Sequence, residues 1–147
     1  MIQDFLKVTG SLTIVKTNVD GEVTQSLHVP NLVVTTGKGY IAGRFGSATP
    51  PAIMSNMAIG SDATVAAIGQ TALIAELGRA ALTTTVVSGA TVTYTASFGT
   101  GVGTGTIYEA AILNAGSGGT MLCRTTFPIV TKQAGDTIAI TWVVTVS

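Results

Sequence analysis

The sequence contains few of the residues that carry out chemistry. Its 147 residues include one histidine and one cysteine, and only 10% are charged, against roughly 25% in an average soluble domain. A single cysteine excludes both an intramolecular disulfide and a zinc cluster. The seven basic and seven acidic residues are scattered. Because nucleic-acid binding needs clustered positive charge, the sequence argues against that partner.

Long hydrophobic runs are also missing. The longest apolar stretches fall well short of the about 20 residues that cross a membrane, and residues 1–7 lack the charged-then-apolar layout of a signal peptide. We therefore expect a soluble protein made in the cytoplasm. Residues 1–7 form a short amphipathic lead, in which Ile2, Phe5 and Leu6 either dock on a neighbour as a helical turn or belong to a frayed terminus.

The sequence does not group residues as an active site requires. A catalytic triad would have to join His28 and Cys123 without an obvious third member, and Cys123 is expected to be a buried small hydrophobe. Neither residues 20–22 nor residues 60–62 have a recognised calcium-loop spacing. The glycine-rich residues 99–105 lack the Lys-Ser/Thr pair and the helix of a phosphate-binding loop. We predict a protein without enzymatic activity, cofactor or metal.

Alternating strands are the clearest positive signal. Between residues 137 and 147, the apolar side chains fall on every second position, which is typical of a strand with one buried face. The side chains expected in the core or at an interface are Trp142, Ile140, Ile138, Val144, Phe127 and Tyr94.

A hairpin precedes this last strand. If residues 114–119 close it symmetrically, Glu109 lies directly opposite Arg124, among side chains that are mostly apolar on both faces. Such a hairpin is expected to be covered on both sides. Unpaired charges would be costly to bury there, so we predict a cross-strand ion pair between Glu109 and Arg124 rather than a catalytic carboxylate.

Two further hairpins are expected nearer the N-terminus. A type I′ turn at Asp20-Gly21 joins residues 8–16 to residues 22–29, which pairs Ile14 with Leu27 and Leu12 with Val29. A type II′ turn at Gly89-Ala90 joins residues 82–87 to residues 91–98, which pairs Val87 with Val92 and Thr85 with Tyr94. Residues 32–34 and 53–60 are the remaining predicted strands.

Two short helices are predicted. The first covers residues 37–45 and is capped by Thr36, although Gly39 and Gly43 weaken it. The second covers residues 70–80, with Glu76 and Arg79 forming a modest surface ion pair three residues apart. Together these elements predict a single all-β domain over residues 1–147: a jelly-roll-like β-sandwich of about eight strands with one or two short helices.

The order of the motifs resembles small structural proteins of tailed bacteriophages and is similar to the tail-collar fibre type. The resemblance covers about residues 31–147, although Ala111 stands where the fibre pattern has glycine and Ile112-Leu113 replaces its Leu-Phe. The motifs are N-L-V-V-T-T-G-K-G-Y-I-A-G-R (31–44), M-A-I-G-S-D (57–62), Q-T-A-L-I-A-E-L-G-R (70–79), I-Y-E-A-A-I-L-N (107–114), M-L-C-R-T-T-F-P-I-V-T-K (121–132) and the terminal strand.

The resemblance implies a non-enzymatic virion component at the tail, collar or fibre attachment. A sandwich with so few charges suits repeated contacts with copies of itself, as a dimer or trimer, and with other virion proteins. The alternative is a capsid decoration protein, since small standalone domains often stabilise capsids. A third hypothesis is a carbohydrate-binding module, which would stack sugars on exposed rings, but the chain has only one tryptophan and three tyrosines.

Overall fold

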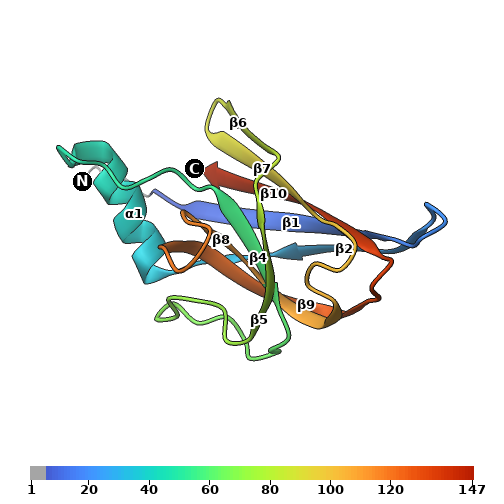
Figure 1. Cartoon of the computed structure of the whole chain (residues 1–147). Coiled ribbons are helices and arrows are strands. Elements are labelled where there is room, and N and C mark those ends of the chain that lie inside the picture. Colours follow the sequence, from blue (N-terminus) through green and yellow to red (C-terminus); the bar gives the residue numbers. More distant parts are fainter. Residues whose placement is uncertain (1–5) are drawn as a thin grey trace.

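The fold is a sandwich of two antiparallel five-stranded sheets, shown in Figure 1 by a computed structural model that describes residues 6–147. The all-β sandwich predicted from the sequence is confirmed, with ten strands and one helix in this part of the chain. Sheet A has the order β2 (Val23–Pro30), β1 (Val8–Thr17), β10 (Thr137–Val146), β7 (Thr91–Phe98) and β6 (Thr84–Ser88). Sheet B has the order β3 (Leu32–Val33), β9 (Met121–Lys132), β8 (Gly105–Leu113), β4 (Asn56–Gly60) and β5 (Glu76–Ala81).

The core lies between the two sheets and follows the alternation of the strands. In β10, the side chains at every second position from Ile138 to Val144 are buried, and Val146 at the end of the strand is partly exposed. Trp142 is fully buried, and its indole Nε1 donates a hydrogen bond of 2.8 Å to Asn31 Oδ1. This bond satisfies the one polar atom of the largest core side chain.

Two hairpins form with the predicted pairing. Ile14 pairs with Leu27 across β1 and β2, and Val87 pairs with Val92 across β6 and β7. At Gly89, φ is 55°, which is the positive value that a type II′ turn requires at its first central residue. The predicted type I′ turn at Asp20-Gly21 is wrong. Such a turn needs a positive φ at both central residues, but Asp20 has none and only Gly21 has one, so the connection is a longer loop.

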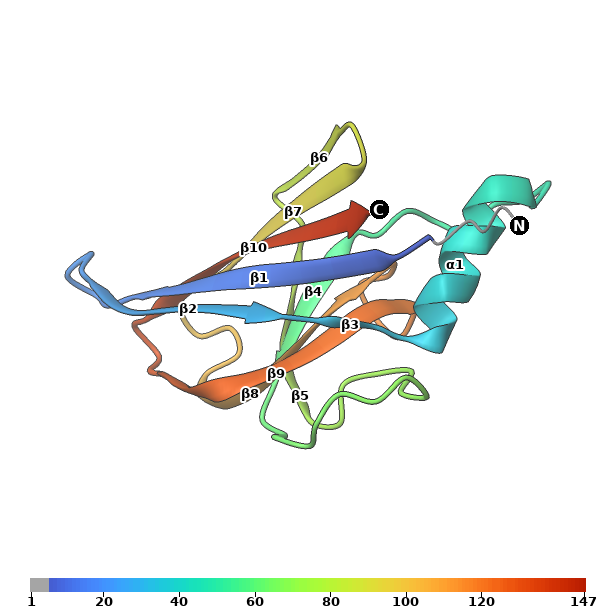
Figure 2. The ribbon, with the colours of Figure 1, turned by 180° about the vertical axis from the view of Figure 1, so that it is seen from behind.

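The single helix among residues 6–147, α1 (Thr35–Gly46), covers one end of the sandwich, as Figure 2 shows from behind. It matches the helix predicted over residues 37–45, but Thr36 does not cap it. The N-cap position is Val34, and the Thr36 hydroxyl donates to the carbonyl of Met121 on β9 instead. A Cβ at Gly37 would overlap the carbonyl oxygen of Leu122. The glycine therefore allows the helix to approach the sheet closely.

The helix predicted over residues 70–80 does not form. Residues 61–75 are an irregular segment, and Glu76–Ala81 is β5, which pairs with β4. The strand predicted over residues 53–60 is shorter, because β4 begins at Asn56. We call residues 61–75 the covering loop, because they lie against sheet B on the side away from sheet A, at the lower edge of the molecule in Figure 1.

The β8–β9 hairpin has a different register from the predicted one. Glu109 lies opposite Thr126, and Arg124 lies opposite Ala111. The pairing is displaced by two residues because the turn closes with Leu113 opposite Met121 and the register shifts once more at a bulge between Ile112 and Leu113. Glu109 and Arg124 keep the same face of the sheet, since the displacement is by two residues and side chains alternate with a period of two. They are therefore diagonal neighbours instead of direct partners.

Candidate functional site

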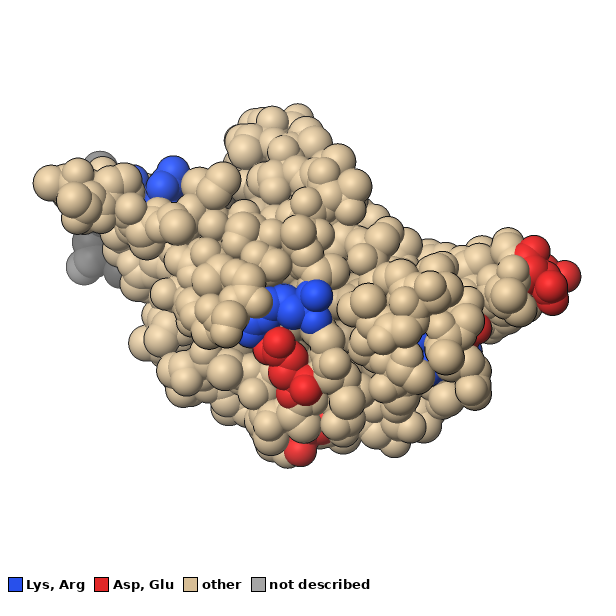
Figure 3. All heavy atoms as spheres, viewed as in Figure 1, with Lys and Arg blue, Asp and Glu red and all other residues tan. Residues whose placement is uncertain are grey.

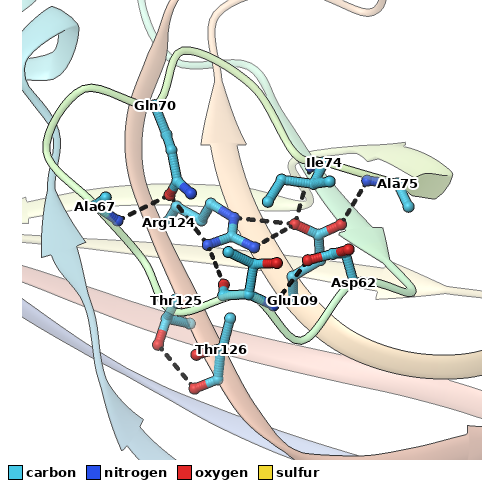
Figure 4. Close-up of polar contacts among 10 residues, drawn as sticks. Asp62, Ala67, Gln70, Ile74, Ala75, Glu109, Arg124, Thr125 and Thr126 are labelled. Carbon is cyan, nitrogen blue, oxygen red and sulfur yellow. Dashed lines mark hydrogen bonds and ion pairs between the residues drawn. The ribbon is translucent and has the colours of Figure 1, made fainter.

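The more deeply buried of the two ion pairs among the described residues joins Glu109 and Arg124. Both side chains are fully inaccessible to solvent. Arg124 Nε donates a hydrogen bond of 2.9 Å to Glu109 Oε2, and Arg124 Nη2 lies 2.8 Å from the same oxygen (Figure 4). The opposite charges compensate each other in a place where either one alone would be costly.

Both carboxylate oxygens of Glu109 also accept hydrogen bonds from the end of the covering loop. The backbone amide of Ile74 donates to Oε2 at 3.1 Å, and the amide of Ala75 donates to Oε1 at 2.8 Å. Both carboxylate oxygens are thus occupied by donors from the same chain, as Figure 4 shows. The carboxylate has the environment of a structural anion with satisfied hydrogen bonds.

Arg124 binds the other half of the covering loop. Its Nη1 donates to the carbonyl of Thr64 at 2.8 Å and to Gln70 Oε1 at 3.1 Å, and the same amide oxygen accepts from the backbone of Ala67 (Figure 4). The buried pair therefore contacts the loop at both of its halves. These two side chains thus supply hydrogen-bond partners for several backbone groups of a loop that lacks regular secondary structure.

An apolar cluster lies beneath the covering loop and explains why the loop is needed. Sheet B buries small and apolar side chains on the face away from sheet A, and Leu73 of the loop packs against them. The cluster consists of Ala58, Ala111, Leu113 and Met121 from sheet B and of Val34, the N-cap residue of α1. Sheet B is thus covered on both faces, which agrees with the apolar pattern on both sides of the β8–β9 hairpin.

Gly60 leaves space for the carboxylate. A Cβ at this position would overlap Glu109 Oε1 and lie 2.5 Å from the carbonyl oxygen of Ala75. The absence of a side chain allows the end of β4, the carboxylate and the end of the loop to meet.

The pair of Glu76 and Arg79 lies on β5, not on a helix. Arg79 binds both carboxylate oxygens of Glu76, at 3.1 Å through Nε and 2.7 Å through Nη2. Its Nη1 also donates to the carbonyls of Ala115 and Gly118, each at 2.9 Å. Arg79 thus connects an edge strand to the β8–β9 turn, a contact that its spacing from Glu76 does not reveal.

His28 and Cys123, the two candidates for a catalytic triad, lie in different sheets. His28 is exposed on β2, where its Nδ1 lies 3.0 Å from the Thr13 hydroxyl. Cys123 is buried on β9, and burial raises the pKa of its thiol well above the usual range. Hydrogen bonds from the side chain and backbone of Thr64 lower the pKa of Asp62. Among residues 6–147, no three His, Cys, Asp or Glu side chains are grouped as a metal site.

Lys132 is a buried charge that the sequence analysis did not identify. Its Nζ donates to the carbonyl of Gly99 at 2.8 Å, so it binds the start of the glycine-rich connection between β7 and β8. Desolvation lowers the pKa of this lysine, against the opposite effect of Asp136. Its position at the end of β9, after an alternating pattern, is the only signal in the sequence that it faces inward.

An apolar groove lies at the end of the sandwich that carries α1, a feature with no sequence signal because its residues come from separate elements. Its volume is about 440 Å³. Most of the lining is aliphatic or aromatic and comes from α1, the segment before β4 and sheet A. The lining includes Phe45, Ile53, Val87, Val92, Tyr94 and Val146.

The expected core or interface residues are all in the core. Trp142, Ile140, Ile138, Val144, Phe127 and Tyr94 are each less than a tenth exposed. In the described part of the chain, no helix is long and apolar enough to cross a membrane. Comparison with family models, with curated proteins and with solved structures finds no match to this chain.

Proposed function

We propose that this protein is a non-enzymatic structural component of a tailed-phage virion, placed at the tail, collar or fibre attachment and acting through contacts between protein chains. The observation that carries the proposal is which partners the buried charges bind. Glu109 and Arg124 are the charged residues best shielded from water, and they form hydrogen bonds with each other and with the chain's own covering loop. Both side chains are fully buried, so neither is accessible to a substrate from solvent.

The surface supports the same proposal. Charged side chains are sparse, as Figure 3 shows for one face, and several large apolar side chains are exposed around the groove at the α1 end. Exposed apolar surface of this kind is typical of protein interfaces. The motif order described above is the reason for proposing a phage virion as the place of assembly.

A carbohydrate-binding role has less support. Trp142 and Tyr94 are buried, while Tyr40 and Tyr108 are only partly accessible. Sugar stacking needs exposed ring faces on a common surface, and these four rings do not provide one.

The test is to measure the copy number of this chain in purified phage particles by quantitative mass spectrometry. A tail, collar or fibre position predicts a few trimers or hexamers around one axis. Hundreds of copies would identify a capsid decoration protein instead, and absence from the particles would overturn the proposal.

A further inference from the structure

We infer that two copies of this chain associate through the exposed edge strand β6, which pairs with β6 of a second copy, next to the apolar groove. The inference rests on the proposed function, since it names the surface through which an assembly protein binds itself. The evidence for it is that β6 differs from the other edge strands in charge, proline content or exposure.

The sandwich has four edge strands, and three of them carry features that discourage pairing. β2 contains His28 and ends at Pro30, β3 is only two residues long, and β5 carries Glu76 and Arg79. Short edges, prolines and charges are the usual means by which proteins prevent edge-to-edge association.

The fourth edge, β6, carries neither charge nor proline and is longer than β3. Its sequence is Thr-Thr-Val-Val-Ser, without charge or proline, and all five residues are exposed. One side of β6 pairs with β7, and its outer side is the open edge of sheet A. β-Branched residues favour the extended conformation that a further strand would meet. Figure 3 has the same view as Figure 1, and the part of the surface at the top, where β6 lies, shows no charged side chain.

The groove beside β6 supplies the apolar area that strand pairing alone lacks. A stable interface buries about 800 Å² on each partner, more than five paired residues can provide. Thr85 and Val87 of β6 line the groove together with Phe45 and Ile53, and Phe45 is 80% exposed. A second copy that extends sheet A would bring its own Val87 to the same side as this groove.

Symmetry makes Val86 the central residue of the contact. It is the third of five residues in β6, so an antiparallel pair related by a two-fold axis places Val86 opposite Val86 of the second copy. The interface would be self-complementary and closed, giving a dimer whose sheet A runs through both copies.

The experiment compares Val86→Lys with Val23→Lys in the full chain. Both valines lie on edge strands of sheet A, on opposite edges, and they are 55% and 61% exposed. Val86→Lys places two like charges opposite each other across the two-fold axis. We expect sedimentation equilibrium to show a dimer for the wild type and for Val23→Lys, and at least a tenfold weaker association for Val86→Lys.

Hydrogen exchange of the wild type gives a second readout that needs no variant. The backbone amides of β6 should exchange more slowly as the protein concentration rises, while those of β2 should not change. If the Val86→Lys variant associates as strongly as the wild type, this interface is overturned and the proposed virion role is left standing. A wild type that stays monomeric would also overturn the interface, while the copy number in particles tests the virion role separately.

Discussion

Replacing Glu109 by alanine should destabilise the fold severely. The change leaves the guanidinium of Arg124 buried without its counter-ion, and it removes the acceptor for the amides of Ile74 and Ala75. Breaking a buried pair by removing one partner costs roughly 3–5 kcal/mol. Because a domain is stable by only about 5–15 kcal/mol, this is a large share of the total.

The effect can be measured by urea denaturation followed by tryptophan fluorescence, since Trp142 is the only tryptophan and lies in the core. With a urea dependence of about 2 kcal/mol per M, the midpoint should fall by ~2 M. Glu76→Ala is the matched control, because it removes a carboxylate from an arginine pair that is partly exposed. Exposed pairs contribute about 0.2–1 kcal/mol, so its midpoint should move little.

A double variant separates the ion pair from the loop contacts. Glu109→Met with Arg124→Met removes both charges, and replacing a buried pair by apolar groups is often neutral. The loop amides of Ile74 and Ala75 would still lack their acceptor, so we expect recovery of only part of the lost stability. Equal midpoints for Glu109→Ala and Glu76→Ala would refute the reasoning, because the buried pair would then contribute no more than an exposed one.

Three further predictions follow from local packing and ionisation. Gly60→Ala should destabilise by about 1–3 kcal/mol, because its methyl group overlaps Glu109, whereas Gly69→Ala, with open space around it, should leave the urea midpoint nearly unchanged. Cys123 should react with a thiol reagent only at the rate at which the native state opens, because it is buried and burial raises its pKa; rapid native labelling would contradict this. Burial raises the pKa of Tyr94 from 10.0 to about 12, so its un-ionised form adds stability below pH 10 that is lost as pH rises towards 12. Unfolding measured across this range should show a smaller loss in Tyr94→Phe, and an identical loss would refute the assignment.

The elements with local signals could be predicted from the sequence alone. The alternation in β10, the hairpin around Gly89 and the pairing of Ile14 with Leu27 depend on side-chain period and turn residues, which lie close together in the chain. The helix over residues 37–45 was predictable from its apolar spacing even though it contains glycines.

The contacts between distant segments depended on the tertiary structure. Residues 70–80 have the apolar spacing of a helix, but the carboxylate of Glu109 binds the amides of Ile74 and Ala75, and β4 pairs with the residues that follow. Tertiary hydrogen bonds outweighed a helix propensity that amounts to a few tenths of a kcal/mol per residue.

For the pair of Glu109 and Arg124, one part of the arrangement followed from the sequence and another part only from the tertiary structure. The cost of burying lone charges in an apolar hairpin indicated that Glu109 and Arg124 would meet, and this followed from the sequence. The register of the β8–β9 turn that makes them diagonal neighbours, the covering loop that they bind and the groove beside β6 were decided by the folded chain. Local patterns determine which face of a strand is apolar, whereas only packing in three dimensions determines what covers that face.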